Sequence, residues 1–297
     1  MPDQPSLFGI QNVHSFTGSA LSEHIQEKKD VFYRMKNNSG ICWRNILWLF
    51  GVKFIKLAVN RGEESDCPKC LIIDDSDLPK TGRYIEKVSR IYDHLSKRFI
   101  LGYKLLTMGY WDGTSFIPMD FSLHRERGKN ASKPFGLKKK EYRKQYRKKR
   151  EKNTHSWDRA READSTKIDS ALRMFWRAIS QGVKVDYVLM DSWFTCDAFV
   201  KAVRRVKKQT VHLIGMYKTP KTKFTFNGER LTHSQIRNKL GNPRRCRKLK
   251  LHYKEAKQLL GLGRCQSNDF DTQIASTTMT MVQYILLTLK FRFEHYE

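Results

Sequence analysis

The sequence predicts a mixed α/β fold, in which a partly antiparallel sheet is followed by parallel strands joined by helices. One observation is that two short apolar runs, Cys70–Ile73 and Val185–Met190, each end directly in acidic residues. The second is that helical spacing, a strand, a helix and another strand follow one another from residue 167 onward. Such alternation is typical of parallel strands connected by helices.

The first 60 residues predict a helical N-terminal region, separate from a sheet domain at residues 61–297. Apolar residues recur at mixed spacings of three and four in Leu21–Tyr33 and in Ile46–Leu57. Gly51 is a possible break in the second of these helices. This region could bind a specific nucleic-acid site or pack as a cap on the sheet domain, and the pattern does not decide between them.

The most apolar stretch of the chain, residues 41–59, predicts a buried or half-buried helix and not a membrane span. Arg44, Lys53 and Lys56 interrupt it, and a spanning helix needs about 20 predominantly apolar residues. The N-terminus also lacks the pattern of a secretory signal. We therefore expect a cytoplasmic protein with no membrane partner.

An antiparallel pair of strands is expected after the first acidic run. Phe99–Tyr110 and Ser115–Leu123 are rich in apolar and β-branched residues, and Asp112-Gly113 between them is a strong hairpin signal. The sheet therefore opens with an acidic strand followed by a hairpin.

The second half of the sheet begins with a helix at Lys167–Ser180, which Gln181-Gly182 should end. The strand that leads to Asp191 comes next, then a helix at Cys196–Arg205 and a strand at Thr210–Met216. One acid follows the first strand and another follows the fourth. This order of elements is the ribonuclease-H-like arrangement.

The two acidic strand ends are the candidate site. Asp74, Asp75 and Asp77 follow the first run, and Asp191 follows the later one. Asp191 alone could equally cap the next helix, because Asp is a preferred N-cap residue. Two such acids far apart in a very basic chain favour divalent-metal chemistry on a polyanion.

The strongly positive net charge of the chain indicates a polyanionic partner. The 297 residues include 57 Lys and Arg against 30 Asp and Glu, for a formal net charge of +27. A hydrophobic content of 39% and an aromatic content of 12% indicate a globular core and not only a basic tail. A general RNA-binding protein fits less well, because it does not explain the two acidic strand ends.

A basic insertion at about residues 124–166 separates the two halves of the sheet. Its densest part, residues 138–150, interleaves tyrosines with basic residues and has few acids. This favours contact with a nucleic-acid backbone over a merely solvated loop. The candidate contact residues are Lys138, Lys139, Lys140, Arg143, Lys144, Arg147, Lys148, Lys149 and Arg150.

Three blocks of the sequence resemble the DDE transposases of bacterial insertion sequences, in particular the insertion-sequence-4 family. The block Leu71–Gly82 resembles the surroundings of the family's first catalytic Asp, and Val188–Phe194 resembles those of the second. Asp93-His94 and Gly102-Tyr103-Lys104 resemble the segment that follows the first block. The likeness runs from about residue 60 to the end.

The resemblance implies a ribonuclease-H-like core that uses Mg²⁺, with Mn²⁺ as a substitute, to cleave and transfer DNA strands. It assigns the first metal ligand to Asp75, which directly precedes a Ser, with Asp74 as the fallback, and the second to Asp191. Trp193 could stack on a displaced base, although packing is the commoner fate of a tryptophan. The implied partner is double-stranded DNA with the element's terminal repeats, bound by a self-associating protein at the bacterial nucleoid.

The third carboxylate of the family pattern is missing. Lys257 matches the last lysine of the family signature on a late helix, yet Lys250 stands where the glutamate should be. Glu255, the nearest acid, would point about 140° away on a helix. An internal deletion explains the departure, so we expect a weak or inactive transposase. The alternative is a non-catalytic DNA-binding remnant that inhibits transposition.

Overall fold

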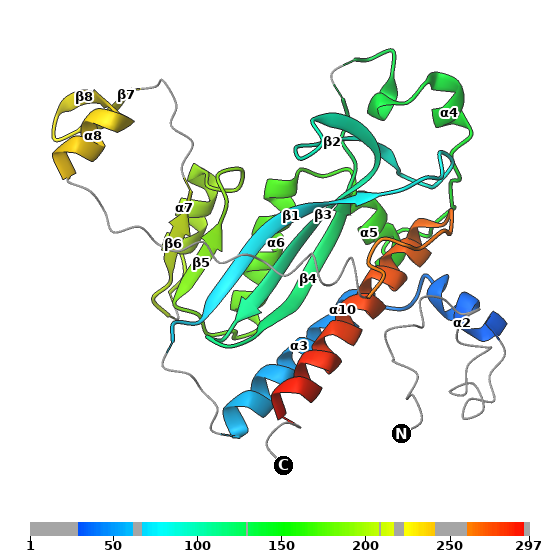
Figure 1. Cartoon of the computed structure of the whole chain (residues 1–297), viewed down its shortest axis with the longest axis horizontal. Helices are drawn as coiled ribbons and strands as arrows, with labels where there is room; N and C mark the ends of the chain where they lie inside the picture. The colour runs from blue at the N-terminus through cyan, green and yellow to red at the C-terminus, as the bar shows by residue number, and fades with distance from the viewer. Residues whose placement is uncertain are drawn as a thin grey trace.

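The computed structural model describes residues 29–61, 67–128, 130–207, 209–216, 223–240 and 260–293. In these residues a six-stranded mixed sheet forms the centre of the molecule (Figure 1). Its strands are β1 (Cys70–Pro79), β2 (Ser89–Asp93), β3 (Arg98–Trp111), β4 (Phe116–His124), β5 (Tyr187–Met190) and β6 (His212–Gly215).

The sheet has the predicted ribonuclease-H-like arrangement. Its strand order is β2-β3-β1-β5-β6, with β4 also paired to β3. β1 runs antiparallel to β3 and parallel to β5, and β5 runs parallel to β6. The predicted hairpin at Asp112-Gly113 joins β3 to β4, and Gly113 adopts a positive φ of 101° there. An antiparallel half and a parallel half therefore meet at β1.

Helices cover the sheet. The two longest, α3 and α10, lie side by side (Figure 1), and both pack against β4. The helix predicted at Lys167–Ser180 is α6, with the same bounds. Within the described ranges, no helix is long and apolar enough to cross a membrane. The helices are α2 (Lys29–Lys36), α3 (Trp43–Asn60), α4 (Lys139–Arg143), α5 (His155–Glu162), α6, α7 (Asp197–Arg204), α8 (His233–Leu240) and α10 (Phe270–Phe293).

The main core lies on one face of β1. Because side chains alternate along a strand, Leu71 and Ile73 enter the large apolar cluster with Phe175 of α6. Cys70 and Ile72 face the other way, into a small cluster. The two faces of β1 therefore have different surroundings, and this decides where the acids that follow can point.

The predicted break at Gly51 is wrong, because α3 is continuous from Trp43 to Asn60. A Cβ atom at Gly51 would overlap the sulfur of Met119 on β4. The glycine therefore lets the helix approach the sheet closely and does not interrupt it. The predicted helical residues before Lys29 lie outside the described residues.

The first acidic strand is longer than predicted. The sequence indicated an end at Ile73, but Asp74 to Pro79 stay paired with β3. Lysines offset the charge of these strand acids: Lys104 lies 2.5 Å from Asp77, and Lys167 lies 2.5 Å from Asp75. Both the pairing residues of β3 and these lysines are far from the acids in sequence, so the local pattern could not reveal the extension.

A small unit that the sequence analysis missed follows the central sheet. It contains the hairpin of β7 (Lys223–Phe226) and β8 (Glu229–Thr232), together with α8. The turn residues Asn227 and Gly228 have positive φ values of 49° and 83°. Asn-Gly is the strongest two-residue signal for such a hairpin, so the sequence did contain the information.

Candidate active site

The parallel pairing of β1 with β5 brings two acids together. Ile73 is the register partner of Met190. The residue that follows Ile73 is Asp74, and the residue that follows Met190 is Asp191. Asp74 lies on the same face of β1 as Ile72, because residues two apart on a strand share a face. β5 ends at Met190, so Asp191 stands at the carboxyl end of its strand, where open α/β sheets place their ligands.

The pKa of Asp74 reflects both its burial and its closeness to Asp191. The pKa is raised from 3.8 to about 6, mainly by burial and to a smaller extent by the negative charges of Asp75 and Asp191. The backbone N–H of Asp75, 2.8 Å from the Asp74 side chain, and the ammonium of Lys167 act in the opposite direction. A divalent cation would stabilise the negative charge of a partly desolvated carboxylate that lies beside other carboxylates.

Asp75 has a different environment. Its Oδ2 lies 2.5 Å from the ammonium nitrogen of Lys167, the first residue of α6. That ammonium also lies 5.4 Å from the ring centre of Trp193 and 6.0 Å from that of Phe194. Phe194 is buried, whereas Trp193 is 54% exposed. A cation therefore already compensates Asp75, and an exposed aromatic face lies beside it.

Asp191 organises the turn that follows β5. Its Oδ1 accepts a hydrogen bond from the backbone N–H of Trp193 at 2.8 Å, and its carbonyl accepts one from the Thr195 hydroxyl at 2.8 Å. The N-cap of α7 is Cys196, with no side-chain cap bond. The alternative in which Asp191 caps this helix is therefore wrong.

The donor set fits a divalent metal in part. Carboxylate oxygens are the ligands that Mg²⁺ prefers, together with water and phosphate oxygens. Among the residues that the structure describes, no group of three His, Cys, Asp or Glu side chains could hold an ion. The segment 241–259, which includes Glu255 and Lys257, lies outside the described residues.

The basic arm, defined as residues 138–150, presents most of its charge to solvent. Seven of its nine candidate contact residues are exposed. They are Lys138, Lys139, Lys140, Arg143, Lys144, Arg147 and Lys149. Because their charges are not shielded by the core, these side chains are available to a polyanion.

The other two candidates turn inward. The Arg150 guanidinium donates to Glu86 at 2.7 Å and to Asp271 at 3.1 Å, and its side chain is only 5% exposed. Lys148 lies 2.8 Å from Asp271 and donates to the Asn37 carbonyl. These two residues attach the arm to the body of the molecule.

Comparison with known proteins decides the family. A family model described as "DDE superfamily endonuclease" matches residues 27–278, which is most of the chain. The chain belongs to this family. No curated protein matches it.

DDE endonucleases act on DNA and generally use a divalent metal, which agrees with the net charge and with the two acids. The matched range of this DDE endonuclease includes α2 and α3 and extends into α10. The N-terminal helices are therefore part of the region that the family shares.

Proposed function

We propose that this DDE endonuclease is the DNA transposase of a bacterial insertion sequence, acting on the terminal repeats of its element. The observation that supports this most is the register of β1 and β5, which brings Asp74 close to Asp191 at the carboxyl end of β5 in a ribonuclease-H-like sheet. The three sequence blocks that resemble insertion-sequence-4 transposases support the finer assignment.

In this proposal Asp74 and Asp191 hold Mg²⁺, or Mn²⁺ in its place. The bound ion would activate the attacking water and stabilise the leaving oxygen of a phosphodiester. Asp75, the ligand that the sequence favoured, is the alternative. We favour Asp74 over Asp75 as the ligand because Asp75 is already paired with Lys167 and because the pKa of Asp74 is raised.

The chain's own residues would hold the DNA. The exposed residues of the basic arm attract the backbone through charge, and base stacking is a role for Trp193. Lys257 is a further proposed contact. Joining two element ends usually requires at least two protomers, so we also propose self-association on DNA, in the cytoplasm at the nucleoid.

We further propose that catalysis is impaired. Lys250 stands where the family signature has its glutamate, and an apparent internal deletion accounts for this. A missing metal-positioning carboxylate removes rate because the reaction depends on positioning and charge stabilisation. The second candidate function, favoured by the same substitution, is a non-catalytic DNA-binding protein that occupies element ends.

The test is Mg²⁺- or Mn²⁺-dependent nicking of labelled DNA that carries the terminal repeats, with DNA binding measured in parallel. Asp191→Asn, Asp74→Asn and Asp75→Asn are compared with the exposed Asp197→Asn as control. We expect slow nicking that Asp191→Asn and Asp74→Asn abolish.

The other outcomes are equally informative. Loss of nicking in Asp75→Asn, with Asp74→Asn active, would return the ligand role to Asp75. Binding without nicking in the unmodified protein would support the second candidate function. Nicking as fast as that of an intact transposase would contradict the impairment.

A further inference from the structure

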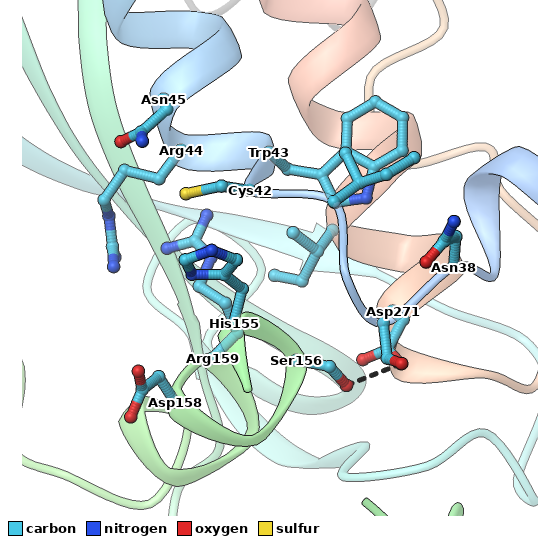
Figure 2. Close-up of a pocket in the computed structure, with 13 residues that line it drawn as sticks. Asn38, Cys42, Trp43, Arg44, Asn45, His155, Ser156, Asp158, Arg159 and Asp271 are labelled. Carbon is cyan, nitrogen blue, oxygen red and sulfur yellow. Dashed lines mark hydrogen bonds between the residues drawn. The ribbon is translucent and has the colours of Figure 1, made fainter. Parts of the chain in front are cut away.

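A cavity of about 230 Å³ lies between the start of α3, α5 and the start of α10, apart from the two acids (Figure 2). The first turn of α3 and one side of α5 form most of its wall. Figure 2 shows the Arg159 side chain extending from α5 toward Cys42 and Arg44 at the start of α3. The lining combines several nitrogen donors with two apolar residues, Ile41 and Ile274.

Arg159 is fixed in place by several contacts, but only some of its N–H groups have a hydrogen-bond partner. Its guanidinium carbon lies 4.5 Å from the ring centre of Phe121, and its Nη1 donates to the Phe121 carbonyl at 2.6 Å and to Glu162 at 2.9 Å. The residue is 6% exposed, yet its Nε and Nη2 atoms have no hydrogen-bond partner. A buried guanidinium with two open donors is costly unless a ligand satisfies them.

The charges around Arg159 do not balance. Three guanidinium groups, of Arg44, Arg159 and Arg177, contact only two carboxylates, those of Asp120 and Glu162. The pKa of Arg159 is lowered to about 10, mainly by burial and also by the nearby charge of Arg44, although Glu162 and Asp120 act in the opposite direction. One positive charge is therefore in excess in this cluster, in which Asp120, Glu162 and Arg159 are buried and Arg177 is 29% exposed.

The acids on the cavity wall do not supply the missing charge. Asp271 is already engaged by Ser156 at 2.7 Å and by Arg150 at 3.1 Å. Asp158 is exposed, and in Figure 2 its carboxylate points away from the Arg159 guanidinium. The excess charge is left for a ligand to neutralise.

Two further features of the wall suit an anion. The 18-residue helix α3 starts here with Cys42 as its N-cap, with no side-chain cap bond and no acid in its first turn. Its positive dipole end therefore faces the cavity without compensation. The indole Nε1 of Trp43 is a third buried donor with no partner.

We infer that this cavity binds one phosphate-type oxyanion, either free phosphate or a phosphodiester of the DNA backbone. The open side of a guanidinium matches two oxygens of a phosphate group, and further oxygens of a tetrahedral anion remain for donors on the other walls. Lys148 of the basic arm contacts Asn37, next to the cavity residue Asn38. DNA held by the arm would thus pass near the cavity, and this second source rests on the proposed function.

The test is titration with inorganic phosphate at constant ionic strength, with chloride as the balancing ion. Calorimetry and thermal unfolding measure the binding. Arg159→Lys keeps one charge but loses the pair of donors, so we expect at least tenfold weaker phosphate binding. Trp43→Phe removes one polar group, the indole N–H donor, and we expect phosphate binding to become several-fold weaker. The exposed Arg161→Lys on the same helix is the control and should bind as the unmodified protein does.

Phosphate without effect beyond chloride overturns the inference. Binding unchanged in both cavity variants also overturns it, and Trp43→Phe decides the matter alone where Arg159→Lys does not fold. Weaker binding of a short DNA duplex in the same variants, together with competition by phosphate, identifies the backbone as the source. Unchanged duplex binding identifies free phosphate. Phosphate binding does not depend on nicking, so failure of the proposed function would be seen separately with Asp191→Asn.

Discussion

Lys167 is a tethered cation beside the candidate metal ligands. It forms the ion pair with Asp75, and its charge lowers the pKa of Asp74. Its side chain is 23% exposed, so water reaches it and the pairing is not locked by burial. A divalent ion that binds these carboxylates must therefore compete with the ammonium for negative charge.

Lys167→Met should strengthen Mn²⁺ binding by roughly fivefold, because removing a like charge near the site leaves about 1 kcal/mol less repulsion. Titration calorimetry with Mn²⁺ measures this. Lys201→Met removes a surface ion pair with Asp197 and serves as the control. Weaker Mn²⁺ binding in Lys167→Met would mean that the lysine supports the site and does not compete with the ion.

His124 makes the stability of the protein depend on pH. It is 2% exposed, and burial lowers its pKa from 6.5 to about 4. Its Nδ1 donates to the carbonyl of Ser165 at 3.2 Å, because a carbonyl can only accept, and its Nε2 then accepts from the Ser122 hydroxyl at 2.7 Å. The folded protein therefore holds the neutral ring.

The unfolded chain binds the proton near pH 6.5, whereas the folded chain binds it only near pH 4. The contribution of His124 is thus fully present above pH 6.5 and is lost as the pH falls toward 4, by about 3 kcal/mol in total. Denaturant unfolding at several pH values should show this slope, and His124→Gln should flatten it. The exposed His94→Gln is the control, and an equal slope in both variants would refute the assignment.

At the scale of elements, the basic arm is attached to the core at one end by a buried ionic network. Arg150, Glu86 and Asp271 come from the arm, from the segment between β1 and β2, and from α10. Their side chains are 4–6% exposed. The position of the arm therefore depends on contacts with parts of the chain far from it in sequence.

Arg150→Met should destabilise the protein by about 3–5 kcal/mol, because it leaves buried carboxylates without their partner. Arg147→Met, on the exposed part of the same arm, should change stability by less than about 0.5 kcal/mol. Chemical denaturation measures both values. Similar small effects in the two variants would show that the network does not hold the arm.

Local patterns predicted the elements whose signals are local. The bounds of α6 and the Asp112-Gly113 hairpin follow from helical spacing and turn chemistry, and both are confirmed. Asp191 as a candidate followed from its place after an apolar run. The extension of β1 depends on its pairing with β3, and the inward turn of Arg150 depends on Glu86 and Asp271, so neither could be read from neighbouring residues.

At the scale of the whole molecule, the charge of +27 predicts DNA affinity that falls steeply with salt. Each phosphate contact adds about 0.9 to the slope of log affinity against log salt. Replacing Lys139 and Lys140 by Ala should therefore lower the slope by about 2, as measured by fluorescence anisotropy. The pair Lys53→Ala and Lys56→Ala, on the exposed side of α3, removes the same charge and should leave the slope nearly unchanged.

An equal loss of slope in both double variants would mean that DNA is attracted by the charge of the whole protein and not by the arm. The comparison separates these two descriptions because both variants have the same net charge. It also requires no knowledge of the DNA sequence that the protein recognises.

The pairing of β1 with β5 also sets an order of events during synthesis. β1 can form its ladder with β3 from a nearby stretch of chain, but β5 supplies its partners only at Tyr187–Met190. A backbone N–H at Lys69 bonds to Asp186, 117 residues later, so closing this contact restricts a long loop. The two carboxylates of the site therefore cannot meet until residue 191 has been made and β5 has docked. A shorter nascent chain contains β1 to β4, and with them Asp74, but lacks Asp191.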